Sequence, residues 1–101
     1  MWFNSLESSP SKNIMKELHI NGLDLVVANI NDQLYCFENR CPHEDFKLSL
    51  GCIKNNQVKC PLHGYAFDLS SGICIDDDIS SLNLYPVKLE DGFISVQLEK
   101  S

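Results

Sequence analysis

The sequence predicts an all-β domain with an antiparallel sandwich or barrel-like fold, and three observations support this. Turn signals recur at short intervals, each able to supply the positive φ or local hydrogen bonds of a tight turn. They are Asn21-Gly22, Asn31-Asp32, Asn55-Asn56, Ser71-Gly72 and Asp91-Gly92. Short runs of β character lie between them, and no segment of about ten residues has the pattern of a capped amphipathic helix. Strands in this rhythm without intervening helices pair antiparallel.

The expected strands follow in chain order. They cover residues 14–20, 23–30, 33–37 and 93–98. The third shows the period of two: Tyr35 and Phe37 fall on one face, whereas Leu34 and Cys36 fall on the other. The first and last alternate in a similar way, and the second is a run rich in Leu and Val. These four segments are the basis of the predicted sandwich.

Residues 39–70 interrupt this rhythm. The stretch is dense in Cys, His, Pro and Gly, and it contains a small predicted hairpin at 53–59. We interpret it as a metal-binding subdomain inserted into a basal β domain formed by residues 1–38 and 71–101. With 101 residues, 44% of them hydrophobic, the chain has room for one domain and one core.

Charge and cysteine content exclude several classes of function. The net charge of −6 and the pI of about 4.8 argue against nucleic acid and anionic membranes, which both require a positive surface. The first twenty residues contain no apolar stretch long enough for a signal sequence or a spanning helix, so a cytoplasmic location is expected. The five cysteines are an odd number in a reducing compartment, which favours metal binding over disulfides.

Two short motifs supply candidate metal ligands. Cys41 and His43 belong to a Cys-Pro-His segment, Cys60 and His63 to a Cys-Pro-Leu-His segment, and sixteen residues separate His43 from Cys60. Two thiolates and two imidazoles suit a [2Fe–2S] centre with both Cys on one iron and both His on the other. A structural zinc site accepts the same ligand types, although its paired ligands are more often two to four residues apart. The zinc alternative therefore stays open.

The residues beside these ligands fit a rigid metal site. Pro42 and Pro61 fix φ next to each cysteine and stiffen the two loops. Gly64 follows the second motif, where the lack of a Cβ allows the backbone to approach a bulky cluster. We expect these residues to surround the metal centre without ligating it.

These motifs closely resemble the Rieske domain. The resemblance rests on residues 41–43 and 60–64, then on Phe67-Asp68 and Ser71-Gly72, and it extends over residues 2–92. It implies a Rieske β domain with an inserted cluster subdomain and one [2Fe–2S] cluster per chain. The size is similar to that of the free Rieske ferredoxins of bacterial ring-hydroxylating oxygenase systems. The resemblance thus implies a monomeric one-electron carrier, not an enzyme, between a flavin-containing reductase and a terminal oxygenase.

Two departures from the respiratory Rieske proteins bear on the reduction potential. Those proteins carry an extra disulfide-bonded cysteine in each cluster loop, at positions that are Phe46 and Leu62 here. They also place serine and tyrosine hydroxyls near the cluster, at positions that resemble Tyr65 and Phe67. Phe67 has no hydroxyl, and fewer donors to the cluster sulfurs lower the potential. The resemblance therefore implies a potential of roughly −150 mV, at the low end of the Rieske range.

Alternatives to the carrier remain. The small subunit of an assimilatory NAD(P)H nitrite reductase is similar in fold and size, but members of that group often lack some of the four ligands. The second alternative is a domain in which a zinc ion or a cluster has a purely structural role. Glu44 and Asp45, which follow the first motif, are expected to steer a basic partner electrostatically into a transient complex.

The remaining Cys, His and Trp residues are interpreted as structural. Cys36, Cys52 and Cys74 are expected to be small buried side chains, although Cys52 lies close to the motifs. His19 is expected at the surface, and Trp2 is expected to anchor the first strand in the core.

Overall fold

The structure is a computed structural model that describes residues 2–42, 46–61, 65–75 and 81–98. Its strands are β1 (Trp2–Asn4), β2 (Met15–Ile20), β3 (Leu23–Ile30), β4 (Gln33–Glu38), β5 (Cys52–Lys54), β6 (Gln57–Lys59), β7 (Ala66–Asp68), β8 (Leu84–Tyr85), β9 (Val87–Glu90) and β10 (Phe93–Gln97). One 3₁₀ turn, η1 (Leu48–Leu50), precedes β5. In the described ranges no helix is both long and apolar enough to span a bilayer.

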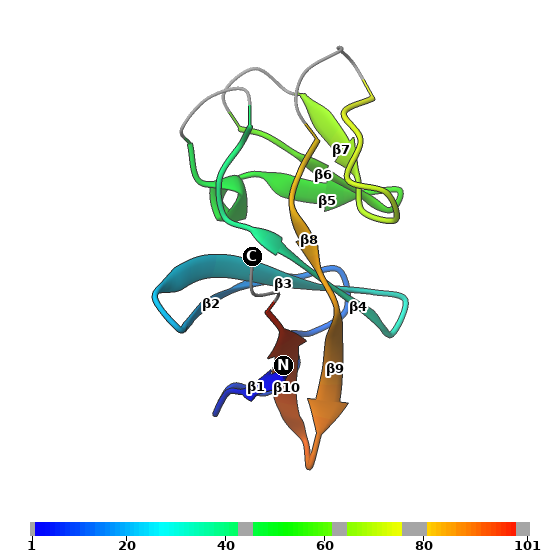
Figure 1. Cartoon of the computed structure of the whole chain (residues 1–101). Helices are drawn as coiled ribbons and strands as arrows, with labels where there is room; N and C mark the ends of the chain where they lie inside the picture. The colour runs from blue at the N-terminus through cyan, green and yellow to red at the C-terminus, as the bar shows by residue number, and fades with distance from the viewer. Residues whose placement is uncertain (1, 43–45, 62–64, 76–80, 99–101) are drawn as a thin grey trace.

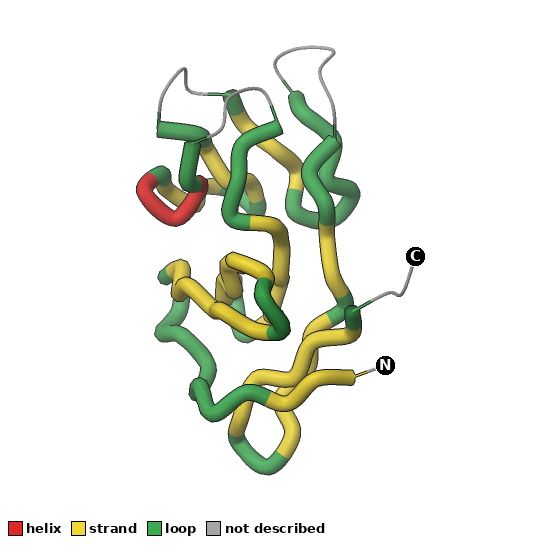
Figure 2. The backbone as a smooth tube through the Cα atoms, turned by 60° about the vertical axis from the view of Figure 1, so that its left-hand side comes forward, coloured by secondary structure: helices red, strands yellow, loops and turns green. Residues whose placement is uncertain are grey.

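The strands form three antiparallel sheets, which confirms the predicted fold class. Their strand orders are β1-β10-β9, β2-β3-β4-β8 and β5-β6-β7. The β5–β7 sheet lies at one end of the molecule, the β1-β10-β9 sheet at the other, and the β2–β4 sheet between them (Figure 1). Figure 2 shows the same succession along the long axis from a second direction. The molecule measures 38 × 31 × 20 Å.

The middle sheet packs on both faces. Val26 and Ala28 of β3 belong to a core shared with the β5–β7 sheet, whereas Leu25 and Val27 belong to a second core shared with β10. The last six residues of β3 are therefore all buried. A strand buried on both faces needs an apolar run rather than strict alternation, which explains its Leu- and Val-rich sequence.

Type I′ geometry accounts for four of the five predicted turns. Both central residues have positive φ: 53° and 79° at Asn21-Gly22, 52° and 69° at Asn31-Asp32, 52° and 63° at Asn55-Asn56, and 54° and 85° at Asp91-Gly92. Two-residue hairpin loops require this backbone, which Asn, Asp and Gly adopt at least cost. At Ser71-Gly72 only the glycine has positive φ, and the segment is a longer loop after β7.

Strands β5, β6 and β7 form the small sheet within the stretch predicted as an inserted subdomain, and the predicted hairpin at 53–59 is the β5–β6 pair. β7 also contacts residues that lie beyond position 70. Phe67 makes an isolated bridge with Cys74, and the amide of Ile75 donates to Ala66 O at 2.8 Å. The subdomain boundary at 39–70 itself stays a prediction.

Two predicted burials are wrong, whereas two others and the placement of His19 are confirmed. Trp2 is 38% exposed and lies on the outside of its sheet, where Lys88 Nζ is 4.4 Å from the ring centroid. Cys52 is exposed, because it lies on the outer face of β5. Cys36 and Cys74 are buried as expected, and His19 is exposed.

Candidate metal centre

The two predicted thiolate ligands begin two loops that close in the same way. The amide of Cys41 donates to Phe46 O at 2.9 Å, and the amide of Cys60 donates to Tyr65 O at 2.8 Å. Each hydrogen bond joins a cysteine to the fifth residue after it. The sequence produces this because β4 ends just before the first loop, and β6 and β7 flank the second. The strands therefore fix where both cysteines stand.

Both cysteines lie in a single hydrophobic cluster. Cys41 is 1% exposed and Cys60 is 2% exposed, and each packs in the core between the middle sheet and the β5–β7 sheet. No disulfide joins any of the five cysteines, all of which lie in described segments. Two buried thiols in one core are the donor set that the thiolate-bound iron of a [2Fe–2S] centre requires.

The histidine half of the predicted site, His43 and His63, lies outside the described residues, as does Gly64. Their assignment as ligands, and the role of Gly64, therefore stay predictions. Of the flanking residues, Pro42 is half-buried, Pro61 is exposed and Tyr65 packs against the cluster that contains both cysteines.

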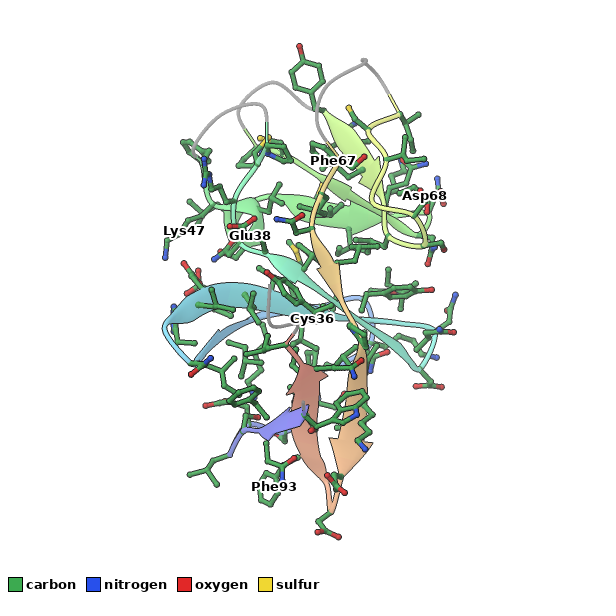
Figure 3. The ribbon with its side chains drawn as sticks, viewed as in Figure 1. Cys36, Glu38, Lys47, Phe67, Asp68 and Phe93 are labelled. Carbon is green, nitrogen blue, oxygen red and sulfur yellow. The ribbon has the colours of Figure 1, made fainter. Side chains whose placement is uncertain are left out.

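Apolar side chains surround the two cysteines. Leu48, Val58 and Phe67 belong to the same cluster, and all three are 0% exposed. Phe67 lies on β7 (Figure 3), where it pairs with Val58 of β6. These three side chains exclude water from the core that contains the two thiols, and Phe67 contributes a hydrocarbon ring without a hydroxyl.

Gly51 is a structural residue of the site that sequence reasoning missed. It lies between η1 and β5, and a Cβ added there would overlap the carbonyl oxygen of Lys59 and lie 3.2 Å from Cδ of Pro61. Those two residues flank Cys60. Gly51 therefore lets the end of the first loop approach the start of the second, and the only sequence signal was a glycine at a strand end.

A polar network fixes the first loop to the middle sheet. Ser49 Oγ donates to Glu17 Oε2 at 2.6 Å, and Lys47 Nζ lies 3.7 Å from Glu17 and 3.3 Å from Asp24. Lys47 extends from the side of the molecule where the loop meets the sheet (Figure 3). Asn39 lies at the centre of this network.

Hydrogen-bond donors and the Lys47 ammonium keep both carboxylates of this network charged, although Asp24 acts to raise the pKa of Glu17. The hydrogen bond from Ser49 lowers the pKa of Glu17, helped by Asn39 and Lys47 and opposed by burial. Burial acts to raise the pKa of Asp24, but hydrogen bonds from Asn39 and Lys47 outweigh it and lower the pKa overall. The same contact with Asp24 raises the pKa of Lys47. Glu17, His19 and Asp24 have ligand atoms within 4.8 Å of one another, and the Lys47 ammonium lies within 4 Å of both carboxylates.

Comparison with known proteins identifies the family of this chain. Residues 2–86 match the family described as Rieske [2Fe–2S] domain. A curated relative, the ferredoxin component of the naphthalene 1,2-dioxygenase/salicylate 5-hydroxylase systems of Ralstonia sp., is 26% identical over 81 residues, which are 79% of this chain and 78% of the relative.

Two solved structures share the fold. One is a chain of the complex of reduced oxygenase and oxidized ferredoxin in carbazole 1,9a-dioxygenase, with a TM-score of 0.79, 24% identity and coverage of 87% of this chain and 92% of that one. The other is described as a small subunit of an NADPH nitrite reductase, with a TM-score of 0.77, 22% identity and coverage of 86% and 88%. At these identities the structures show a common fold. Since the family match spans most of the sequence and includes both buried cysteines, the chain belongs to the Rieske [2Fe–2S] family, and its cofactor is a [2Fe–2S] cluster.

Proposed function

We propose that this chain is a one-electron carrier that holds its cluster on Cys41, His43, Cys60 and His63. The observation that carries the proposal is the pair of buried cysteines at the start of two equivalently closed loops in one core. We assign the cluster to the unit formed by residues 39–70. No substrate reacts on this chain, which acts as a component of a larger oxidoreductase system.

The chain's own residues would hold the cluster in a rigid and dry environment. The bound cluster supplies reversible one-electron chemistry. Hydrogen bonds from the Cys41 and Cys60 amides close the loops, so the ligand positions change little between oxidation states. Because Phe67 offers no hydroxyl to the cluster sulfurs, we expect a potential of roughly −150 mV, at the low end of the Rieske range.

The partners follow from the named relatives. The Ralstonia relative is the ferredoxin component of a dioxygenase system, and the carbazole chain is in a complex with an oxygenase. We propose that this chain likewise passes electrons from a flavin-containing reductase to a terminal oxygenase of the ring-hydroxylating type, as a cytoplasmic monomer. Its charge of −6, with Glu44 and Asp45 beside the first motif, supports transient docking onto basic partners that weakens with salt.

The first test is metal analysis of anaerobically purified protein. About two irons and two sulfides per chain are expected, with an EPR spectrum of mixed nitrogen and sulfur ligation after reduction. Stoichiometric zinc without sulfide would overturn the proposal in favour of a structural zinc domain.

Cysteine variants sharpen this test. Cys60→Ser should abolish cluster assembly, whereas Cys74→Ser is a matched control that should keep the cluster, because Cys74 is buried in the same core and is not a proposed ligand. A normal cluster in Cys60→Ser would refute the ligand assignment.

A second candidate function is the small subunit of a nitrite reductase, since a protein of that description shares the fold. The presence of all four proposed ligand residues in this sequence favours the carrier. Reduction by a flavin reductase followed by turnover of a ring-hydroxylating oxygenase supports the carrier. Electron delivery only to a nitrite reductase large subunit supports the alternative.

A further inference from the structure

Asn39 occupies an unusual position for a polar side chain. It follows the end of β4, precedes Cys41 by two residues and is only 5% exposed. Its backbone amide donates to Asp24 O at 2.9 Å, so the main chain is held against β3 at this point. A buried amide side chain is costly unless its hydrogen-bonding groups are satisfied.

The side chain of Asn39 satisfies this requirement by joining three segments. Its Oδ1 accepts a hydrogen bond from the Ser49 amide at 2.9 Å. Its Nδ2 lies 3.2 Å from Ser49 Oγ, from Glu17 Oε2 and from Asp24 Oδ1. Ser49 completes the arrangement by donating from Oγ to the same oxygen of Glu17. One amide thus connects β2, β3 and η1, the 3₁₀ turn that follows the first loop.

These contacts close the first cysteine loop at its base. Asn39 and Ser49 lie on either side of the segment that contains Cys41, and the Cys41–Phe46 hydrogen bond lies inside this closure. The second loop needs no such device, because β6 and β7 hydrogen-bond to each other on either side of it. The first loop follows β4 but leads only into η1.

We propose that Asn39 is a positioning residue for the metal centre: with Ser49 and Glu17 it holds the first cysteine loop in register with the second. The proposal rests on the ligand assignment proposed above. Glu17 is suited to this role because its hydrogen bonds favour the carboxylate, the form that accepts both donors. Groups that hold metal ligands in place typically change metal affinity or activity 10- to 100-fold when they are removed.

The experiment uses the cluster-loaded protein and four variants. Asn39→Ala removes the centre of the closure, Ser49→Ala removes its hydroxyl, and Ser49→Thr restores that hydroxyl. Ser95→Ala is the control: Ser95 is 0% exposed and its Oγ donates to Asn4 Oδ1 at 2.8 Å, in the sheet at the opposite end of the molecule. The readouts are the EPR g-values, the midpoint potential and the rate of iron release to a chelator, all measured well below the unfolding temperature.

Asn39→Ala and Ser49→Ala should shift the g-values and the potential and should release iron roughly 10- to 100-fold faster. Ser49→Thr should resemble the wild type. Ser95→Ala should lower the unfolding temperature and leave the spectrum and the potential unchanged. If Asn39→Ala does not fold, Ser49→Ala carries the test.

Native g-values, potential and iron release in both alanine variants would overturn the proposal, and so would equal changes in Ser95→Ala. The ligand assignment is tested separately by Cys60→Ser. If Asn39→Ala and Ser49→Ala keep the native g-values, potential and iron release while Cys60→Ser has no cluster, the positioning role is refuted and the ligand assignment stands.

Discussion

Replacing Gly51 by alanine should damage the metal centre without touching a ligand. The new Cβ would overlap the carbonyl oxygen of Lys59, so the two segments must separate until that contact reaches the 3.4 Å of ordinary packing. The obstacle is backbone, which cannot rotate away as a flexible side chain does. The peptide groups that move are those on either side of Cys60.

The size of the effect follows from overpacking. Extra methyl groups in packed interiors cost typically 1–3 kcal/mol, and a rigid backbone neighbour places Gly51→Ala at about 3 kcal/mol. For a domain of this size that corresponds to a fall of roughly 12–24 °C in the unfolding midpoint. We also expect a lower iron content, since the Cys60 loop shifts relative to the Cys41 loop.

Gly22→Ala is the matched control. Gly22 has φ of 79° and no atom within 4 Å of an added Cβ, so its substitution strains the turn without a clash. That strain costs about 1 kcal/mol, or roughly 4–8 °C. Circular dichroism at one heating rate and the iron-to-protein ratio measure both variants. A midpoint for Gly51→Ala no lower than that of Gly22→Ala would refute the close approach.

Two further predictions concern pH and thiol reactivity. Since the pKa values of Glu17 and Asp24 in the folded protein lie below their ordinary values of 4.5 and 3.8, their stabilisation is present above these values and is lost as the pH falls through the folded pKa values. In urea unfolding between about pH 5 and 3, Glu17→Gln should therefore lose less stability than the wild type, by under about 1 kcal/mol for such exposed groups; equal losses would contradict this. Burial raises the pKa of Cys36 to about 12, whereas Cys52 is exposed, so maleimide at neutral pH should modify Cys52 alone in the loaded protein. Mass spectrometry should show one adduct per chain and none in Cys52→Ser, and labelling that persists in that variant would contradict the assignment.

The fold was predictable where local chemistry decides it. Four two-residue turns require positive φ at both central residues, and the Asn, Asp and Gly residues at these positions predicted them. The long strands β2, β3, β4 and β10 were also visible from their patterns, whereas the short strands β7, β8 and β9 carry too few residues for a period to show. Trp2 was misplaced because its strand lies at a sheet edge, where an aromatic side chain can lie on the outer face.

The sequence predicted which residue types would bind the metal, but not which other residues hold the cysteine segments in place. The spacing of Cys and His predicted four ligands; the structure places the two cysteines in one core, and the assignment of the histidines stays a prediction. Asn39, Ser49 and Glu17 could not be connected from sequence, because they meet only after β2 and the first loop pack together. The close packing of Gly51 and the exposure of Cys52 could not be predicted from sequence for the same reason. Both depend on how the three-residue strand β5 pairs with β6.

The double-sided burial of β3 links the two ends of the molecule energetically. Its alternate side chains belong to different cores, so an opening at either end exposes apolar side chains of a strand on which the other end also packs. A truncated side chain at Val27 weakens the distal packing with Ile94 and Val96, yet it disturbs the same strand that carries Val26 toward the cysteines. Local unfolding at the end remote from the redox centre is thereby converted into loss of cofactor, and the protein should melt and bleach in a single transition.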